Sequence, residues 1–196
     1  TPSSCDGYQY QERNQESTSF ELRIASLDDA ELTWMAGIYY TTIEREVVVS
    51  YGADLGDGVF GRTPYVLGRT DLLFWDKFDT DVFAVYGMAE FEPAENHTIT
   101  LAGRYDIEDR DVSNKVPNVP SSSAFGGGSP INPAYDGSFA DSIPSRDDEF
   151  KQFQPKVSWR WAFKNDASLY ASYGVGFRSG GFNNLGSAAL VESVER

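Results

Sequence analysis

The sequence is poor in sulfur, in imidazole and in positive charge. Its 196 residues include one cysteine, Cys5, and one histidine, His97. A single cysteine excludes an internal disulfide and a zinc site built from cysteines. The sequence has 16 basic and 30 acidic residues, which give a formal net charge of −14. Nucleic-acid binding instead needs clustered lysine and arginine. We therefore expect no nucleic-acid partner, no cofactor and no metal centre.

Long hydrophobic runs are missing as well. No stretch approaches the roughly 20 apolar residues of a membrane-spanning helix. The composition is nevertheless 40% hydrophobic and 14% aromatic, which is too high for a disordered chain. Membrane-spanning β-strands show alternation rather than continuous hydrophobicity, so a membrane β-barrel is compatible with this composition.

The dominant period in the sequence is two. Apolar or small side chains occupy every second position of six segments, and mostly polar side chains lie between them. This alternation is typical of strands with one apolar and one polar face. Short turns at 27–31, 93–96 and 164–166 join the segments in pairs, so we expect six strands in three hairpins. The paired segments are 20–25 with 32–41, 82–92 with 98–108, and 156–163 with 167–178.

Long segments rich in Gly, Pro, Ser, Asn and Asp connect the hairpins, near 52–78, 111–149 and 179–196. Short turns at one rim and long loops at the other are typical of bacterial outer-membrane barrels. A strand over 97–110 would span roughly 45 Å at about 3.3 Å per residue, which crosses a bilayer at a tilt of about 45°. Two alternatives stay open: a passive porin-type barrel, and a soluble β-sandwich binding module, whose inner faces are also rich in aromatic residues.

Five short motifs on these segments resemble strand motifs of TonB-dependent outer-membrane receptors. In chain order they are FELRIAS at 20–26, WMAGIYY at 34–40, FAVYG at 83–87 with LAGRY at 101–105, FQPKV at 153–157, and LYASYGVGFRSGGFN at 169–183. The long loops carry no such motif. The resemblance implies a barrel of about 22 strands around an N-terminal plug, of which this chain supplies about six.

The resemblance also implies a location in the bacterial cell outer membrane and energy-coupled import of a scarce nutrient. A ferric siderophore, cobalamin, haem or a carbohydrate is the implied substrate, and no catalysis is expected. The implied partners are outer-membrane lipid, the plug domain, the TonB complex and the small-molecule nutrient.

We expect an all-β fold, a fragment of an antiparallel transmembrane β-barrel with long extracellular loops. Residues 1–17 are expected as a lead-in or loop, 18–183 as the partial barrel domain and 184–196 as the start of an extracellular loop. Six strands cannot close a barrel, since the smallest single-chain ones have about eight, so we expect a piece of a longer protein.

Polar positions of the strands point to the lumen if the apolar positions meet lipid. A lipid-facing Arg or Lys at mid-depth costs about 2–4 kcal/mol, so six such errors would exceed a total stability of about 5–15 kcal/mol. We expect these side chains mainly to form cross-strand ion pairs, with plug docking or solute guidance as the alternative. The predicted lumen-facing residues are Glu21, Arg23, Arg104, Asp106, Glu108, Lys156, Arg160 and Arg178.

Aromatic side chains on the long loops are the candidate ligand contacts, because the resemblance implies nutrient binding at the extracellular loops. They are Tyr65, Phe74, Trp75, Phe125, Tyr135 and Phe139. Two acidic groups are expected to be solvated: the first lacks the ligand spacing of a calcium loop, and for the second cation binding at the barrel mouth is the alternative. They are Asp54 with Asp57, and a rim at the barrel mouth formed by Asp106, Glu108, Asp109 and Asp111.

Overall fold

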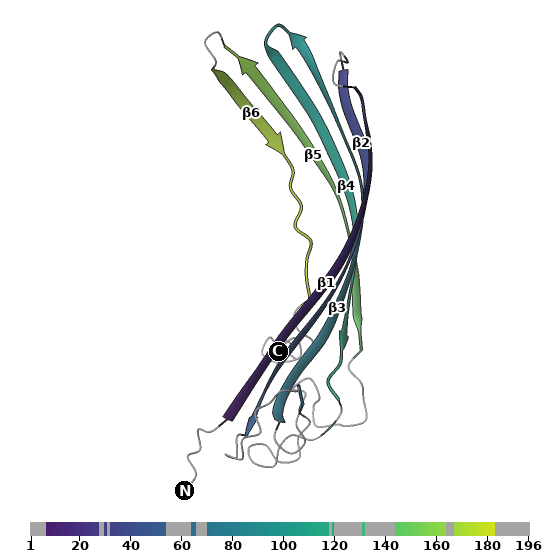
Figure 1. Ribbon diagram of the computed structural model, residues 1–196, viewed down its shortest axis with the longest axis vertical. Helices are drawn as coiled ribbons and strands as arrows, with labels where there is room; N and C mark the ends of the chain where they lie inside the picture. The colour runs from purple at the N-terminus through teal and green to yellow at the C-terminus, as the bar shows by residue number, and fades with distance from the viewer. Residues whose placement is uncertain are drawn as a thin grey trace, which may run out of the picture.

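The structure, a computed structural model, consists of one antiparallel sheet of six strands (Figure 1). The strands are β1 (Gly7–Ala25), β2 (Leu32–Ala53), β3 (Thr70–Ala94), β4 (His97–Asn114), β5 (Arg146–Ala162) and β6 (Ser168–Gly174). The structure describes residues 7–27, 30, 32–53, 64–65, 70–117, 119, 131, 144–163 and 167–182. Over these residues, it contains no helix of sufficient length and hydrophobicity to cross a membrane.

Each strand pairs with the strands before and after it in the chain, and every pairing is antiparallel. Figure 1 shows long, twisted strands that curl into part of a cylinder, with the strand ends that the short turns join at the top. This neighbour-to-neighbour order is that of an up-and-down barrel. The expected all-β class and the three hairpins are therefore confirmed.

Several strands are longer than their apolar alternation indicated. β1 begins at Gly7, inside the segment expected as a lead-in, and β3 begins at Thr70, inside an expected loop. β4 and β5 also extend into the segment 111–149, which was expected to be a loop throughout. These extensions pair with one another, for example Gln15 with Arg45, but they carry charged side chains on both faces beside apolar ones such as Val48 and Leu73. Backbone pairing therefore continues beyond the residues in which apolar and polar side chains alternate.

The turn between β3 and β4 is shorter than the four residues expected. Ala94 pairs with His97, which leaves the two-residue turn Glu95-Asn96. Asn96 has a φ of 65°, a left-handed conformation that asparagine adopts more readily than most residues. An irregularity in the register between Phe91 and Ala94 absorbs the difference in length.

One face of the sheet, the outer face, exposes large apolar side chains across all six strands. Phe20 is 58% exposed, Leu101 is 48% exposed and Tyr173 is 72% exposed. Burying a side chain of this size is worth about 1.5–3 kcal/mol, and monomeric soluble proteins rarely expose apolar patches beyond a few hundred Å². Such a face requires lipid or another apolar cover. The exposed set includes Phe20, Leu22, Ile24, Trp34, Ile38, Tyr40, Phe83, Val85, Leu101, Tyr105, Phe153, Val157, Trp161, Leu169 and Tyr173.

The opposite face, the lumen face, is crowded and polar. Asp106 is 5% exposed and Glu108 is 8% exposed although both are charged residues, and Thr98 and Ser158 are buried as well. Buried carboxylates require charged or hydrogen-bonding partners. The polar side chains of this face are therefore expected to bind one another.

A close approach at Gly37 locks three strands together on the lumen face. The Tyr86 side chain of β3 lies across Gly37 of β2, and its hydroxyl donates a hydrogen bond to the Glu21 carboxylate of β1. A Cβ on Gly37 would lie 2.5 Å from the Tyr86 ring and 3.0 Å from the Leu22 carbonyl oxygen. A larger residue at this position would have to displace the Tyr86 ring.

A small hydrophobic core lies at the long-loop end of the sheet. Val48, Leu73, Val116 and Ile131 are buried together. Backbone hydrogen bonds hold the connecting segments there: the Leu73 N–H donates to the Ile131 carbonyl at 3.0 Å, and the Ile131 N–H donates to the Val119 carbonyl at 3.1 Å. Partly buried side chains that pack on this core are Tyr10, Tyr65, Trp75 and Val119.

Candidate functional site

The predicted ligand contacts separate into three groups. Tyr65 and Trp75 pack on the small core, and the Trp75 indole donates a hydrogen bond to the Glu46 carboxylate on the outer face. Phe74, the neighbour of Trp75 on β3, is half-buried on the lumen face. Phe125, Tyr135 and Phe139 lie outside the described residues. Ligand contact stays a prediction for all six.

Seven of the eight predicted lumen-facing residues lie on the lumen face. The strand pairing places them at the positions that alternate with the exposed apolar side chains, and therefore on the other face of the sheet. Arg178 follows β6, beyond the residues whose pairing defines a face, and is exposed, so its orientation stays a prediction. Whether these residues act in ion pairing, in plug docking or in solute guidance stays a prediction. The seven are Glu21, Arg23, Arg104, Asp106, Glu108, Lys156 and Arg160.

Ion pairs within β4 satisfy the buried carboxylates of the lumen face. Arg104 binds Asp106 through two nitrogens, with Nη2 2.7 Å and Nε 2.9 Å from Oδ1. The Gln154 amide donates to the same carboxylate at 2.5 Å, and the Arg104 guanidinium lies 5.3 Å from the centre of the Tyr39 ring. This ion pair joins residues i and i+2 of one strand, as does the pair of Arg110 with Glu108, whereas the cross-strand contact of Asp106 is the hydrogen bond from Gln154.

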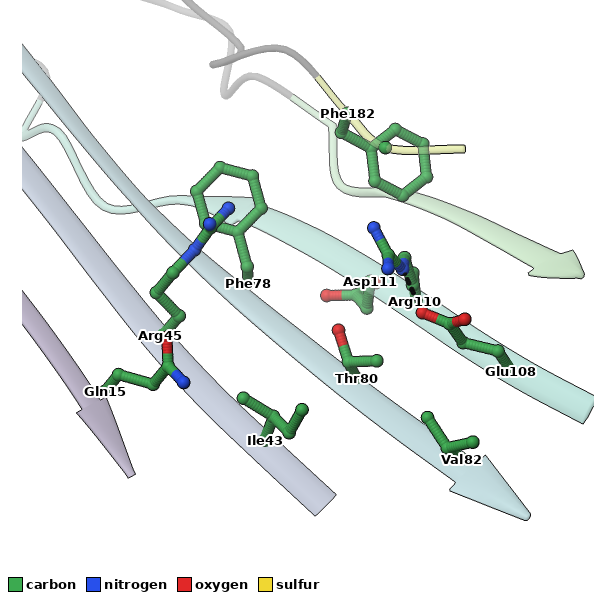
Figure 2. A pocket seen from close by; sticks show the side chains of 11 residues that line it. Gln15, Ile43, Arg45, Phe78, Thr80, Val82, Glu108, Arg110, Asp111 and Phe182 are labelled. Atoms are coloured by element: carbon green, nitrogen blue, oxygen red, sulfur yellow. Dashed lines mark hydrogen bonds and ion pairs between the residues drawn. The ribbon is translucent and has the colours of Figure 1, made fainter. Parts of the chain in front are cut away.

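Nearer the long-loop end, the lumen face is hollowed into a pocket of about 230 Å³ (Figure 2). Arginine and phenylalanine side chains alternate around it, and strands β1 to β4 and the segment after β6 all contribute. We refer to it as the lumen pocket. Its lining residues are Gln15, Ile43, Arg45, Phe78, Thr80, Val82, Glu108, Arg110, Asp111, Gly181 and Phe182.

Arg110 fastens the chain segment 179–182 over this pocket. Its Nε donates to Glu108 at 2.5 Å, its Nη1 to the Gly180 carbonyl at 2.7 Å and its Nη2 to the Ser179 hydroxyl at 2.6 Å. A Cβ on Gly180 would lie 2.8 Å from the Phe150 ring, so a larger residue there would require this ring to move. These contacts place Phe182 above the pocket, as Figure 2 shows.

Arg45 occupies the other side of the pocket in a different way. Its guanidinium carbon lies 4.4 Å from the centre of the Phe78 ring, and the side chain is exposed. A guanidinium stacked on an aromatic ring is attracted by the electrons of the ring face. Figure 2 shows the Arg45 guanidinium next to the Phe78 ring, across the pocket from Arg110.

Sequence reasoning singled out Glu108 and Asp111 among the lining residues and missed the others. On β3, every second residue before Val82 lies on the lumen face, which includes Thr80 and Phe78. On β2, every second residue after Tyr39 lies on the same face, which includes Ile43 and Arg45. Extending the alternation past the apolar band would have identified these positions. Gly181 and Phe182 gave no such signal because they follow the last strand.

The expected acidic rim at the barrel mouth is divided between the two faces. Asp106 and Glu108 lie on the lumen face with their arginines, whereas the register places Asp109 and Asp111 on the outer face, and Asp111 also borders the lumen pocket. On the outer face they join acidic residues of β3 and β5 in an acidic collar just beyond the apolar band. Like charges stand directly opposite each other, since Asp81 pairs with Asp109 and Asp111 with Asp147. The collar consists of Asp79, Asp81, Asp109, Asp111, Asp147 and Glu149.

Two lysines offset part of the charge of the acidic collar. Lys77 lies 3.0 Å from both Asp79 and Glu44, and Lys151 lies 2.5 Å from Glu149. The hydrogen bond to Asp79, and to a lesser extent the one to Glu44, raises the pKa of Lys77, so this lysine keeps its charge at neutral pH. No group of three or more His, Cys, Asp or Glu side chains in the described part of the chain could hold a metal ion.

A sheet of consecutive antiparallel strands, curled around a polar face and apolar on its exposed face, defines the wall of a membrane-spanning β-barrel. The family model described as "TonB dependent receptor-like, beta-barrel" matches residues 2–192. The chain therefore belongs to the TonB-dependent receptor β-barrel family, as its strand motifs indicated. The members of this family are transporters of the outer membrane of Gram-negative bacteria.

The fold is also similar to that of a solved receptor. The ferric yersiniabactin uptake receptor FyuA from Yersinia pestis matches with a TM-score of 0.54 and 14% sequence identity. The match covers 85% of this chain and 21% of that receptor, so the chain spans about a fifth of the receptor's length. No curated protein matches the chain.

Proposed function

We propose that this chain is part of the wall of an outer-membrane receptor that imports a scarce nutrient by TonB-coupled active transport. The match to the receptor barrel family over residues 2–192 is the observation that carries the proposal. The outer face would meet outer-membrane lipid, and the lumen face would meet the plug domain and the passing nutrient. Ferric siderophores, cobalamin, haem and carbohydrates are the candidate substrate classes.

The division of the charged residues between the two faces supports this proposal. Within the apolar band the outer face exposes Leu101, Val85 and Phe153, whereas the lumen face carries Arg104 and Asp106 at the same depth. Reversing the faces would place an arginine in hydrocarbon at a cost of about 2–4 kcal/mol. The arrangement is thus stable only around a polar interior, which transport of a soluble nutrient requires.

Uptake measurements on cells test the proposal. A strain that lacks the full-length receptor is compared with the parent for accumulation of radiolabelled iron chelates, cyanocobalamin, haem and maltodextrin. We expect the parent to accumulate one of these faster, and that advantage to disappear when TonB is deleted or a protonophore collapses the proton gradient. A restored advantage on re-expression of the receptor controls for secondary effects. Receptor-dependent uptake that persists without TonB would show a passive pore instead.

A further inference from the structure

We propose that residues 175–182, which we call the strap, have two alternative arrangements in the barrel wall, and that Arg110 is the latch that selects between them. In the observed arrangement the strap lies over the lumen face, and its end covers the lumen pocket. In the second arrangement the strap extends β6 along the edge of β5 and leaves the pocket uncovered. The proposal concerns the wall itself and applies to a gated or a passive barrel, so it does not rest on TonB-coupled import.

The strap follows a strand that ends before its sequence pattern does. β6 pairs with β5 from Ser168 to Gly174, and one further hydrogen bond runs from the Val175 N–H to the Pro155 carbonyl at 2.9 Å. The alternation of apolar and polar side chains nevertheless continues to Phe177. Figure 1 shows the chain leaving β5 at this point and running separately towards the long-loop end. The strap therefore has the alternation of a strand, but beyond its first residue it pairs with no strand in the described part of the chain.

The edge of β5 beside the strap is open. Residues 147–154 of β5 pair with β4 on one side, and on the other side no strand among the described residues pairs with them. An open edge presents a row of backbone N–H and C=O groups that pairs readily with an extended segment. Continued in the register of β6, this edge would receive the strap with Gln152 opposite Arg178.

Arg110 holds the strap away from that edge. Its Nη1 donates to the Gly180 carbonyl at 2.7 Å and its Nη2 to the Ser179 hydroxyl at 2.6 Å, while its Nε donates to Glu108. Gly180 lies directly against the Phe150 ring, since a Cβ on this glycine would be 2.8 Å from it. The Arg110 guanidinium carbon lies 6.0 Å from the centre of the same ring. One arginine of β4 thus fixes the strap on the lumen face of β4 and β5.

The latch and the edge of β5 compete for the strap. Every second residue of β6 faces outward, as the exposed Leu169 and Tyr173 do, and the same alternation places Ser179 on the outer face once the strap is paired. The Ser179 hydroxyl would then lie on the other side of the sheet from Arg110. Pairing therefore breaks this hydrogen bond and carries Phe182 to the far side of β5, away from the lumen pocket.

Each arrangement has interactions that the other lacks. The observed one has hydrogen bonds from a charged guanidinium, which are stronger than those between neutral groups. The paired one gains backbone hydrogen bonds along β5, and it places the half-buried Phe177 opposite Phe153 on the outer face, where Phe153 is 56% exposed. Loss of the latch should therefore move the strap onto β5 and widen the lumen at the long-loop end.

Disulfide trapping in the full-length receptor measures the paired arrangement. A receptor in which every native cysteine, Cys5 included, is replaced by serine would carry Gln152→Cys with Arg178→Cys, the strap pair. These positions lie opposite each other only when the strap pairs with β5. The matched control pair is Ser158→Cys with Ser172→Cys, which lie opposite each other in β5 and β6.

The two cysteine pairs have the same geometry when paired. The last backbone hydrogen bond between β5 and the strap makes both of them non-hydrogen-bonded pairs, whose Cα atoms lie about 4.5 Å apart, within the range of a disulfide. Outer membranes are oxidised with copper phenanthroline, and the remaining thiols are counted by the gel shift with a PEG-maleimide. We expect the strap pair to close at least about tenfold more slowly than the control pair, because a latched strap is paired only in a minor population.

Removal of the latch should accelerate closure of the strap pair. We expect at least about a tenfold gain in rate for Arg110→Gln, because the strap loses two hydrogen bonds from a charged group. Ser179→Ala removes one of these bonds and keeps the ion pair of Arg110 with Glu108, so a gain of about threefold is expected. The control pair should close at an unchanged rate in both variants, and retained heat-modifiable gel mobility shows that each barrel is folded.

An alanine in the strap tests the same equilibrium without removing a hydrogen bond. The Cβ of Gly180→Ala would meet the Phe150 ring at 2.8 Å in the observed arrangement, whereas opposite side chains of paired strands have Cβ atoms about 4.5–5.5 Å apart. We expect the strap pair to close about threefold faster in this variant. Gly176→Ala is the matched control, because nothing lies within 4 Å of a Cβ there, and its rate should be unchanged.

Three results would overturn the proposal. Equal closing rates of the strap pair and the control pair without further substitution would show that the strap is permanently paired. Closure of the control pair alone, in every variant, would show that the strap never pairs with β5. Equal rates for the strap pair with and without Arg110→Gln would show that Arg110 is not the latch. Disulfide trapping needs no TonB, so these results are independent of the uptake measurements that test the proposed function.

Discussion

Tyr86 shows how one side chain on the lumen face ties three strands together. It lies on β3, crosses Gly37 of β2 and bonds to Glu21 of β1. An aromatic ring over a glycine of the neighbouring strand covers backbone that the glycine would leave bare. The same contact gives the Glu21 carboxylate a neutral hydrogen-bond donor.

Replacing Gly37 with alanine should displace the Tyr86 ring. The added Cβ would lie 2.5 Å from the ring and 3.0 Å from a backbone oxygen, so we expect a loss of about 1–3 kcal/mol in the free energy of unfolding. The midpoint of heat-modifiable gel mobility of the full-length receptor measures it. Gly176→Ala is the control, because nothing lies within 4 Å of a Cβ there, and its midpoint should stay unchanged. Equal midpoints for the two variants would show that Tyr86 does not rest on Gly37.

At the scale of the strand, each long element has an apolar part and a polar extension. In β3 the outer-face positions Phe83 and Val85 are exposed and apolar, whereas Asp79 and Asp81 farther along the same face belong to the acidic collar. The change falls within a single step of the alternation, between Asp81 and Phe83. A strand that crosses from hydrocarbon into water requires such a change of polarity at the interface.

Arginine substitutions at adjacent positions of β4 test the assignment of faces. Leu101→Arg should block assembly of the receptor in the membrane, because an arginine on the outer face costs about 2–4 kcal/mol at mid-depth. Thr100→Arg should be better tolerated, because Thr100 lies on the lumen face 2.7 Å from the Glu90 carboxylate. Heat-modifiable mobility of outer-membrane fractions reports assembly. Equal effects of the two substitutions would contradict the assignment.

The sequence predicted the apolar parts of the strands and missed their extensions. Ile99, Leu101 and Tyr105 alternate with polar residues, and this period defined β4 and its outer face without further information. The lumen pocket was missed because Arg45 and Phe78 lie where the apolar alternation has ended, and their proximity depends on the β2–β3 register. Register is a pairing between distant segments, and a single sequence contains no signal for it here.

At the scale of the whole molecule, the net charge of −14 is concentrated rather than spread evenly. Six acidic residues form the collar, and Glu16 and Glu44 continue one of its rows on β1 and β2. Like charges directly across a sheet are destabilising unless water and salt screen them. The collar therefore marks the level at which the outer face leaves the hydrocarbon on the long-loop side.

Labelling of single cysteines locates this boundary. The full-length receptor with Cys5 replaced by serine would carry a cysteine at Asp81 or at Val85, which lie on the same strand and face about 13 Å apart. We expect a membrane-impermeant maleimide to label Asp81→Cys on intact cells and to leave Val85→Cys unmodified. Detergent solubilisation should then expose both. Equal labelling of both before solubilisation would exclude a lipid boundary between them.

The order of the strands has a consequence for how such a wall changes in evolution. In the described part of the chain each strand contacts only the strand before it and the strand after it. Loss of β3 and β4 together would bring β2 beside β5 with opposite directions, so that a new antiparallel pair forms. Loss of one strand alone would leave parallel neighbours, which a short turn cannot join. The gene for this wall can therefore lengthen or shorten by whole hairpins, and the circumference changes two strands at a time.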